Sequence, residues 1–209
     1  MPLIWTEYNA DYSNQFPVTD SAYMGPFLAN TIRECDGLTE MMSYWTFSDV
    51  FEEQGVVKTP FYGGFGILAE RSIPKPAFND FALLHRLGET RLDVSSDSTL
   101  VTRGKDGSLI IAVWNLFLPE DAGSPKTVTL RFKGLPQSRS ALITIVDKEH
   151  GSPLPAYEKL GRPASPTPSQ IDALRKAAAL PAARQQAITN GSLTIELQPH
   201  ALALIEVSK

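Results

Sequence analysis

The chain begins with a short apolar run that ends in a carboxylate. Leu3–Thr6 has the composition of a buried β-strand, and Glu7 follows it directly before a polar loop. In β/α barrels the catalytic groups lie at the carboxyl ends of such strands. Because a strand at residue 3 has no barrel in front of it, we expect this sequence to be the second half of a larger enzyme.

The sequence up to about residue 90 alternates between strand-like and helix-like patterns. A helix is predicted from a cap at Thr19–Asp20 to about Cys35, with a kink or a late start because Pro26 lies inside the pattern. A second buried strand is predicted at Met41–Phe47. A second helix is predicted from Pro76 to Leu87, where the apolar spacing is helical. The order strand, helix, strand, helix predicts two parallel β/α units.

The sequence changes near residue 90 and becomes mostly strand-like, with turn residues between the runs. One helix is predicted inside this part, at Gln170–Ala179. The predicted strands are Thr99–Arg103, Ser108–Phe117, Thr127–Phe132, Ala141–Val146, Ser192–Leu197 and Ala201–Val207. Several short strands with turns predict an antiparallel β-sandwich. We therefore divide the chain into a barrel segment, residues 1–90, and a sandwich domain, residues 91–209.

Composition excludes several kinds of partner. Nineteen basic and 23 acidic residues give a net charge of −4 without a basic cluster, which argues against a nucleic-acid partner. No apolar run approaches the roughly 20 residues of a membrane span, so no membrane partner is expected. The three histidines and the single cysteine, Cys35, have no companions at metal-ligand spacing, so we expect neither a metal nor a cofactor.

Acidic and aromatic side chains follow both predicted strands of the first part. Because parallel strands end on the same side of a sheet, we expect four carboxylates around one mouth: Glu7, Asp49, Glu52 and Glu53. Trp45 and Phe65 can add flat apolar surfaces beside them. Carboxylates bind hydroxyl groups and aromatic rings stack on the C–H face of a sugar ring, so this combination indicates a carbohydrate ligand.

Four sequence blocks resemble, in order and spacing, the C-terminal half of family 39 glycoside hydrolases: Trp5–Asn9, Tyr44–Glu53, Phe61–Ile67 and Lys75–Phe78. This family contains retaining β-xylosidases and the related α-L-iduronidases. Gly161–Pro163 and Pro168–Ile171 resemble the family's accessory domain more weakly. The resemblance implies an α/β plus all-β fold: the last two β/α units of a TIM (β/α)8 barrel, followed by an antiparallel β-sandwich.

The resemblance also implies roles for individual residues. Glu7 corresponds to the catalytic nucleophile at the end of barrel strand seven, and three sugar-binding positions follow strand eight: Trp45, Glu52 and Glu53. The family's general acid/base is a glutamate in an Asn-Glu-Pro motif after strand four, and this chain contains no Asn-Glu-Pro. Tyr62 replaces a histidine that is common at its position. Since retaining hydrolysis needs two carboxyl groups, we expect the 209 residues alone to be inactive.

The sequence therefore predicts the C-terminal segment of a retaining β-xylosidase acting on xylo-oligosaccharides or xylosides, with Glu7 as nucleophile. One alternative is a non-catalytic carbohydrate-binding or structural β-sandwich. Another is an α-L-iduronidase-like enzyme, which needs basic residues to bind a uronate. The segments expected to line the sugar site carry mostly acidic residues, which favours a neutral pentose as the ligand.

The first 90 residues are not expected to be stable by themselves, because two parallel strands cannot close a barrel. Leu3–Trp5 and Met41–Phe47 would expose apolar faces and unpaired edges. We expect this segment to pack on the missing barrel half, on a second copy, or on the sandwich. Of these three, the sandwich is the least expected to cover the exposed strands, because its one predicted helix is too small to replace six β/α units.

Overall fold

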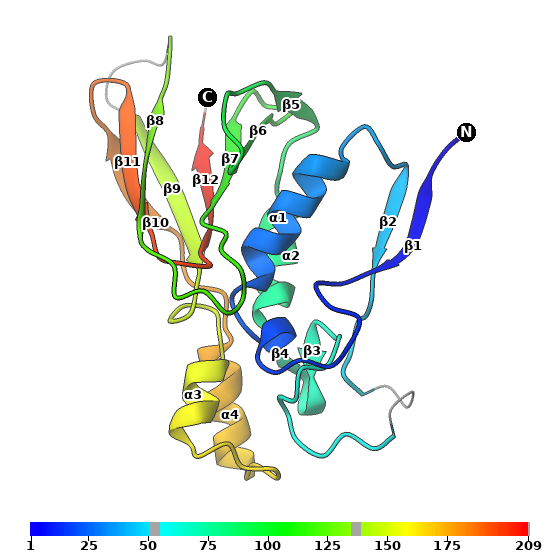
Figure 1. The fold of residues 1–209 in the computed structure, drawn as a ribbon. Helices are drawn as coiled ribbons and strands as arrows, with labels where there is room; N and C mark the ends of the chain where they lie inside the picture. The colour runs from blue at the N-terminus through cyan, green and yellow to red at the C-terminus, as the bar shows by residue number, and fades with distance from the viewer. Residues whose placement is uncertain (51–54, 135–138, 209) are drawn as a thin grey trace.

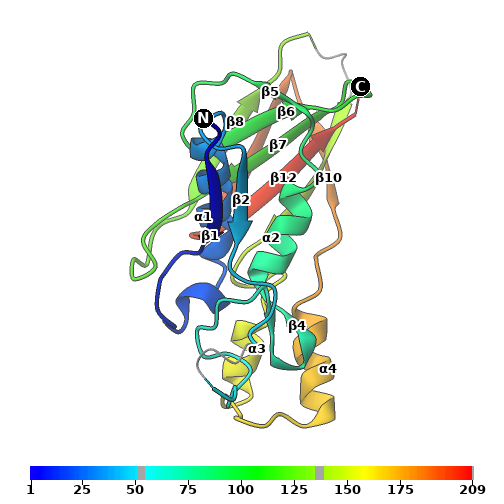
Figure 2. The same cartoon turned by 90° about the vertical axis from the view of Figure 1, so that its right-hand side faces the viewer.

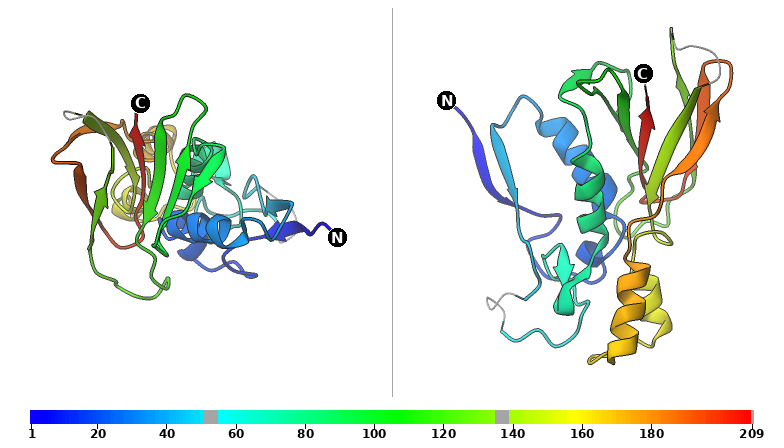
Figure 3. Two further views of the ribbon diagram at one scale, coloured as in Figure 1. Left: turned by 90° about the horizontal axis from the view of Figure 1, so that it is seen from above. Right: turned by 180° about the vertical axis from the view of Figure 1, so that it is seen from behind.

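The computed structural model describes residues 1–50, 55–134 and 139–208 and consists of three layers. A β-sandwich forms one side of the molecule, the helices α1 and α2 lie in the middle, and a two-stranded sheet forms the other side (Figure 1). The view from above shows the same succession of layers (Figure 3). The amino terminus lies at the end of the molecule where the two-stranded sheet begins.

The first part of the chain contains β1 (Ile4–Tyr8), the 3-10 turn η1 (Val18–Asp20), α1 (Met24–Cys35), β2 (Met41–Tyr44), β3 (Leu68–Ala69), the 3-10 turn η3 (Glu70–Ser72), β4 (Ile73–Pro74) and α2 (Pro76–Leu84). The predicted helix begins late, as Pro26 indicated, because α1 starts at Met24, and the predicted cap at Thr19–Asp20 is wrong. Asp20 does not cap a helix. Its carboxylate is buried and accepts a 2.7 Å hydrogen bond from the backbone N–H of Gly63.

β1 and β2 pair in parallel, as the sequence predicts, with Ile4 opposite Met41 and Tyr8 opposite Tyr44. β2 is shorter than the predicted strand, because the backbone changes its hydrogen-bonding partner after Trp45, whose N–H still donates to the carbonyl of Tyr8 at 3.0 Å. The N–H of Thr46 donates to the carbonyl of Phe65 at 2.9 Å, so the backbone bonds to a later segment instead of continuing along β1.

One face of this small sheet packs on the helix layer through aromatic side chains. Tyr44 contacts Tyr8 and Phe81 of α2 edge to face, with ring centroids 5.7 and 5.3 Å apart. The two strands lie in front of the helices when the molecule is turned by 90° (Figure 2). Ile4, at 51% exposure, and Met41, at 57%, remain uncovered, which agrees with the expectation that these strands expose apolar surface.

The second part contains β5 (Thr90–Leu92), β6 (Thr99–Arg103), β7 (Leu109–Trp114), β8 (Lys126–Arg131), β9 (Arg139–Val146), α3 (Leu154–Lys159), α4 (Pro168–Ala177), β10 (Arg184–Ile188), β11 (Ser192–Leu197) and β12 (Leu202–Val207). Six strands form one sheet in the order β10-β9-β12-β7-β6-β5, and β8 pairs with β11 in a second. All these pairs are antiparallel.

Three elements of this part were not predicted: β5, α3 and β10. β10 has the sequence Arg-Gln-Gln-Ala-Ile and lies at the edge of the sheet with its side chains mostly exposed, so it lacks an apolar alternation. α3 is six residues long and begins between Pro153 and Pro155, which read as loop residues in the sequence.

The six-stranded sheet is buried on both faces. On β12, Ala203, Ile205 and Val207 point into the sandwich, towards β8 and β11. Leu202 and Leu204 of the same strand point the other way and pack with the apolar side chains of α1 and α2. The sandwich therefore covers the helices of the first part, whereas Ile4 and Met41 of the two strands stay uncovered. The helices of the first part use the outer face of its sheet as their main support.

The helices α3 and α4 extend from one end of the sandwich (Figure 1). Tyr157 of α3 packs against Phe61, with ring centroids 4.9 Å apart. The guanidinium of Arg162 lies 4.0 Å from the ring centroid of Phe16, a distance suited to a cation–π contact. The loops that follow β1 and β2 are thus held by contacts with the second part of the chain.

Candidate active site

An open depression of about 800 Å³ lies at the carboxyl ends of β1 and β2. Its lining consists of residues from β1, the loop after it, and two aromatic residues from later segments: Trp5, Glu7, Tyr8, Asn9, Ala10, Asp11, Tyr12, Trp45 and Phe65. Glu7 is exposed. Among the described residues no hydrogen bond or ion pair to its carboxylate is found, so that group is available to a ligand.

Three of the five predicted site residues come together in this depression: Glu7, Trp45 and Phe65. The other two, Glu52 and Glu53, lie outside the described residues. Asp49, which was expected at the same mouth, is not there. Its side chain is buried, at 1% exposure for the residue, and forms an ion pair with Lys75. The expectation is wrong because a lysine 26 residues later draws this loop acid into the interior.

The amide of Asn9 connects the end of β1 to both aromatic residues. Its Nδ2 donates to the backbone carbonyl of Trp45 and, at 3.1 Å, to that of Phe65. Its Oδ1 accepts from the N–H of Ala10 at 2.7 Å. Because Asn9 follows Glu7 by two residues, this amide fixes the carboxylate's strand end relative to the aromatic side of the depression.

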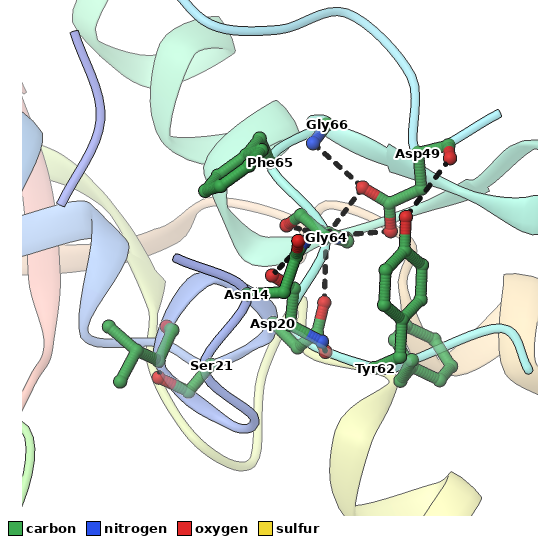
Figure 4. A network of polar contacts seen from close by, with 12 residues as sticks. Asn14, Asp20, Ser21, Asp49, Tyr62, Gly64, Phe65 and Gly66 are labelled. Carbon is green, nitrogen blue, oxygen red and sulfur yellow. Dashed lines mark hydrogen bonds and ion pairs between the residues drawn. The ribbon is translucent and has the colours of Figure 1, made fainter. Parts of the chain in front are cut away.

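A buried ion cluster supports the loop that carries Phe65 (Figure 4). We call Asp20, Asp49 and Lys75 the ion cluster, because the Nζ of Lys75 lies 2.7 Å from Asp20 Oδ1 and 2.8 Å from Asp49 Oδ2. All three side chains are fully buried. The Nζ donates hydrogen bonds to Asp49 Oδ1 at 3.0 Å and to the carbonyl of Gly64 at 2.7 Å, and its contact with Asp20 is an ion pair.

Glycine is required where this loop meets the ion cluster. A Cβ at Gly64 would lie 2.4 Å from the carboxylate of Asp49, closer than any side chain could tolerate. Gly63 has a φ of +83°, and a Cβ there would lie 2.5 Å from the backbone of Gln15 and Phe16. The Gly63–Gly66 loop is therefore a close-packed backbone segment.

Asp20 and Asp49 share the single positive charge of Lys75, so the negative charge of Asp49 is only partly neutralised. Burial raises the pKa of Asp49 to about 6, and the neighbouring carboxylate of Asp20 adds to this rise, while the ammonium of Lys75 opposes it. Burial also raises the pKa of Tyr62 to about 12 and that of Tyr44 above its usual value. The hydroxyl of Tyr62 donates to the backbone carbonyl of Asp49 at 3.2 Å.

Sequence reasoning missed the ion cluster, although one signal was present. Lys75 immediately precedes Pro76 at the start of α2, where a cation is disfavoured by the helix dipole. A lysine at a helix start, between apolar residues, indicates a buried carboxylate partner. Which carboxylates these are could not be read from the sequence, because Asp20 and Asp49 lie 55 and 26 positions earlier.

The described parts of the chain contain no group of three or more His, Cys, Asp or Glu side chains arranged to hold a metal ion. Within the same parts, every helix falls short of the length and apolarity needed to cross a membrane.

The depression can supply one reactive carboxylate. Its other acid, Asp11, accepts hydrogen bonds from the N–H of Ser13 at 2.9 Å and its hydroxyl at 3.0 Å, so it stabilises a turn. An exposed carboxylate beside two half-buried aromatic rings can attack or hold a ligand that has both an electrophilic centre and an apolar face.

Known glycoside hydrolases resemble this chain in both sequence and fold. The family described as glycosyl hydrolases family 39 matches residues 1–193. A β-xylosidase of Geobacillus stearothermophilus is 37% identical over 214 residues, covering 100% of this chain and 42% of that protein. The crystal structure of a monomeric β-xylosidase from Caulobacter crescentus superposes with a TM-score of 0.88 at 24% identity, over 100% of this chain and 45% of that one.

A bacterial orthologue of human α-L-iduronidase has the same fold, with a TM-score of 0.74 and 18% identity, over 100% of this chain and 42% of that one. The chain thus spans less than half of the length of the relatives it matches.

Proposed function

This chain belongs to glycosyl hydrolase family 39, and we propose that it is the C-terminal segment of a retaining β-xylosidase. In this proposal Glu7 is the catalytic nucleophile. Trp45, Phe65, Glu52 and Glu53 bind the xylosyl group. The acid/base glutamate belongs to a part of the protein outside these 209 residues.

The observation that carries the proposal is the position of Glu7. Its exposed carboxylate stands at the carboxyl end of a parallel strand, in the same depression as Trp45 and Phe65. Barrel enzymes use this end of the strands for chemistry. The 37% identity to a β-xylosidase over the full length of the chain supports the assignment of substrate class.

The chemistry requires two steps. The Glu7 carboxylate attacks the anomeric carbon, the bond to the leaving oxygen breaks, and the acid/base group gives that oxygen its proton. The acid/base group then takes a proton from water, whose oxygen attacks the same carbon and releases Glu7. Each displacement inverts the anomeric centre, so the product retains its configuration.

The charge of the depression favours a neutral pentose over a uronate. Its described lining contains the acids Glu7 and Asp11 and no lysine or arginine. A uronate carboxylate would face these acids without a cation to bind it. This supports the β-xylosidase proposal over an α-L-iduronidase-like activity.

We further propose that β1 and β2 are the last two strands of a (β/α)8 barrel and that residues 91–209 form an accessory sandwich. The uncovered apolar side chains of the two-stranded sheet support this arrangement, because preceding barrel strands would bury them. These side chains are Leu3, Ile4, Trp5 and Met41, which are 48–57% exposed.

The proposal is tested by replacing Glu7 in the complete protein. We expect Glu7→Ala to lower kcat on an aryl β-xyloside by roughly a thousandfold or more, equivalent to about 4 kcal/mol of transition-state stabilisation. Azide can occupy the vacated space and attack in place of the carboxylate. It should partly restore turnover and yield a xylosyl azide of inverted configuration.

Glu40→Gln is the matched control, since Glu40 is exposed and immediately precedes β2, at the opposite end of the strands. Its turnover should equal that of the unmodified protein. Near-normal turnover in Glu7→Ala, or azide rescue with retained configuration, would remove Glu7 from the role of nucleophile.

A further inference from the structure

We propose that the ion cluster of Asp20, Asp49 and Lys75 is a positioning device for the sugar site, and that it works when Asp49 is ionised. In this form it holds Phe65 and Asn9 in the geometry that binds the xylosyl group. The inference rests on the proposed function of the same depression. None of the three side chains touches the depression, so each acts through the Gly63–Gly66 loop.

The cluster contacts the loop directly, through three hydrogen bonds. Asp20 Oδ2 accepts from the N–H of Gly63, Lys75 Nζ donates to the carbonyl of Gly64, and Asp49 Oδ1 accepts from the N–H of Gly66, each at 2.7 Å. Every member of the cluster therefore binds a different backbone group. These groups lie on both sides of Phe65, so the cluster fixes its backbone from before and after.

The loop is connected in turn to the depression through the carbonyl of Phe65. The carbonyl of Phe65 accepts from Thr46 N–H at 2.9 Å and from Asn9 Nδ2 at 3.1 Å. Asn9 also donates to the carbonyl of Trp45. A shift of the loop would move the Phe65 ring and disturb the amide that ties both aromatic residues to the end of β1.

The cluster contains more negative than positive groups. Two carboxylates share one ammonium in a site without solvent access, which leaves the cluster with a net charge of −1. The groups that face Asp49 are Lys75 before α2, Asp20 of η1, and the hydroxyls of Tyr44 and Tyr62. A proton on Asp49 would weaken its attraction to Lys75 and its acceptance from Gly66.

The pKa of Asp49 is raised to about 6 by burial and by Asp20. The carboxyl is therefore ionised above that pH and neutral below it. Since the ionised form holds the loop, sugar affinity should be full at neutral pH and should fall as the pH drops through this value.

The test uses the complete protein and xylose, the product of the proposed reaction, as the probe. The dissociation constant of xylose and the NMR signal of the Gly66 amide are followed from about pH 7.5 to about pH 5, which spans the expected change. We expect the Gly66 signal to titrate with a midpoint near the Asp49 pKa, and the affinity to fall at least about threefold over the same range.

Asp49→Asn resembles the protonated form, so its xylose affinity should be low and should not change over this pH range. Asp93→Asn, a matched change at an exposed aspartate after β5, should behave like the unmodified protein. If Asp49→Asn does not fold, the proposal is tested by the pH dependence of xylose affinity and of the Gly66 signal in the unmodified protein. A constant affinity while Gly66 titrates would overturn the proposal, and so would an unchanged pH dependence in Asp49→Asn.

Failure of the proposed function gives a different result. If xylose does not bind at any pH, the assignment of the depression as a xyloside site is contradicted. The coupling between the ionisation of Asp49 and the position of Asn9 is then measured from the NMR signals of the Asn9 side-chain amide. Signals that follow the Gly66 titration support the positioning role, and signals that do not move overturn it.

Discussion

The side-chain amide of Asn9 donates a 3.1 Å hydrogen bond to the backbone carbonyl of Phe65, across 56 residues of sequence. Through its second bond, to the carbonyl of Trp45, one polar side chain links the strand that carries Glu7 to both aromatic residues of the depression. The Glu7 carboxylate and the two aromatic residues are therefore positioned as one unit, and it is through this unit that we propose the buried cluster influences binding.

The first prediction concerns stacking by Phe65. If its ring covers about 50 Å² of sugar C–H surface, it contributes about 1.3 kcal/mol to binding, so Phe65→Ala should raise KM for a xyloside roughly tenfold. The value of kcat should change less, because stacking is present before and after bond cleavage. Steady-state kinetics of the complete protein measure both constants.

Phe78→Ala is the control for this change, because Phe78 lies on α2 with 39% exposure and does not line the depression. Its kinetics should match those of the unmodified protein. A Phe65→Ala variant with an unchanged KM would exclude a stacking role for that ring.

The second prediction concerns Glu52 and Glu53, which lie outside the described residues. If each carboxylate binds a sugar hydroxyl, its loss removes roughly 1.5–3 kcal/mol, so Glu52→Gln or Glu53→Gln should lower kcat/KM by about 10- to 150-fold. Thermal unfolding should not change. Glu34→Gln, at an exposed position on α1, is the control, and equal kinetics in all three variants would contradict the assignment.

The third prediction concerns Asp80, which is buried on α2 and whose carboxyl oxygens have no hydrogen-bond partner among the described residues. Burial raises the pKa of this group well above its ordinary value. The folded state therefore retains a proton that the unfolded chain releases near pH 4, and the free energy of unfolding decreases as the pH rises above that value.

Asp80→Asn should remove this pH dependence and raise the midpoint of urea unfolding at neutral to alkaline pH. Asp172→Asn, an exposed aspartate on α4, should leave the midpoint unchanged. Gly25→Ala should lower the midpoint, because its Cβ would lie 2.6 Å from Asp80 Oδ1. A lower midpoint in Asp80→Asn at every pH would indicate that the ionised carboxylate is required.

The fourth prediction concerns the 209 residues by themselves. They supply the proposed nucleophile but no Asn-Glu-Pro glutamate to protonate the leaving oxygen, and the uncatalysed departure of a sugar alkoxide is slow. An assay of the purified 209-residue chain on an unactivated xylobioside should detect no turnover. Turnover at an enzymatic rate that disappears in Glu7→Gln would reveal a second functional carboxyl group within these residues.

Much of the fold could be predicted where local sequence signals were complete. β6 and β11 have the predicted bounds, because turn residues flank both runs in the sequence. The meeting of Glu7 with Trp45 and Phe65 could be anticipated, because parallel strands end on the same side of a sheet.

Other features depend on contacts that the sequence does not encode locally. Asp49 looks like a surface acid until Lys75 is placed beside it, and β10 forms because β9 offers an edge. The helix layer on the sandwich did have a signal: β12 is apolar almost throughout, from Leu202 to Val207. A continuous apolar strand indicates burial on both faces, which a sandwich alone would not require.

The most direct test of the central claim is covalent trapping of the nucleophile in the complete protein. A 2-deoxy-2-fluoro-β-xyloside with a good leaving group permits the first displacement and slows the second, so a xylosyl-enzyme should accumulate. Mass spectrometry of the digested protein should find one fluoroxylosyl group on the peptide that contains Glu7, attached to that side chain and absent in Glu7→Gln. Stoichiometric attachment to a different carboxylate would contradict the assignment of Glu7 as the nucleophile.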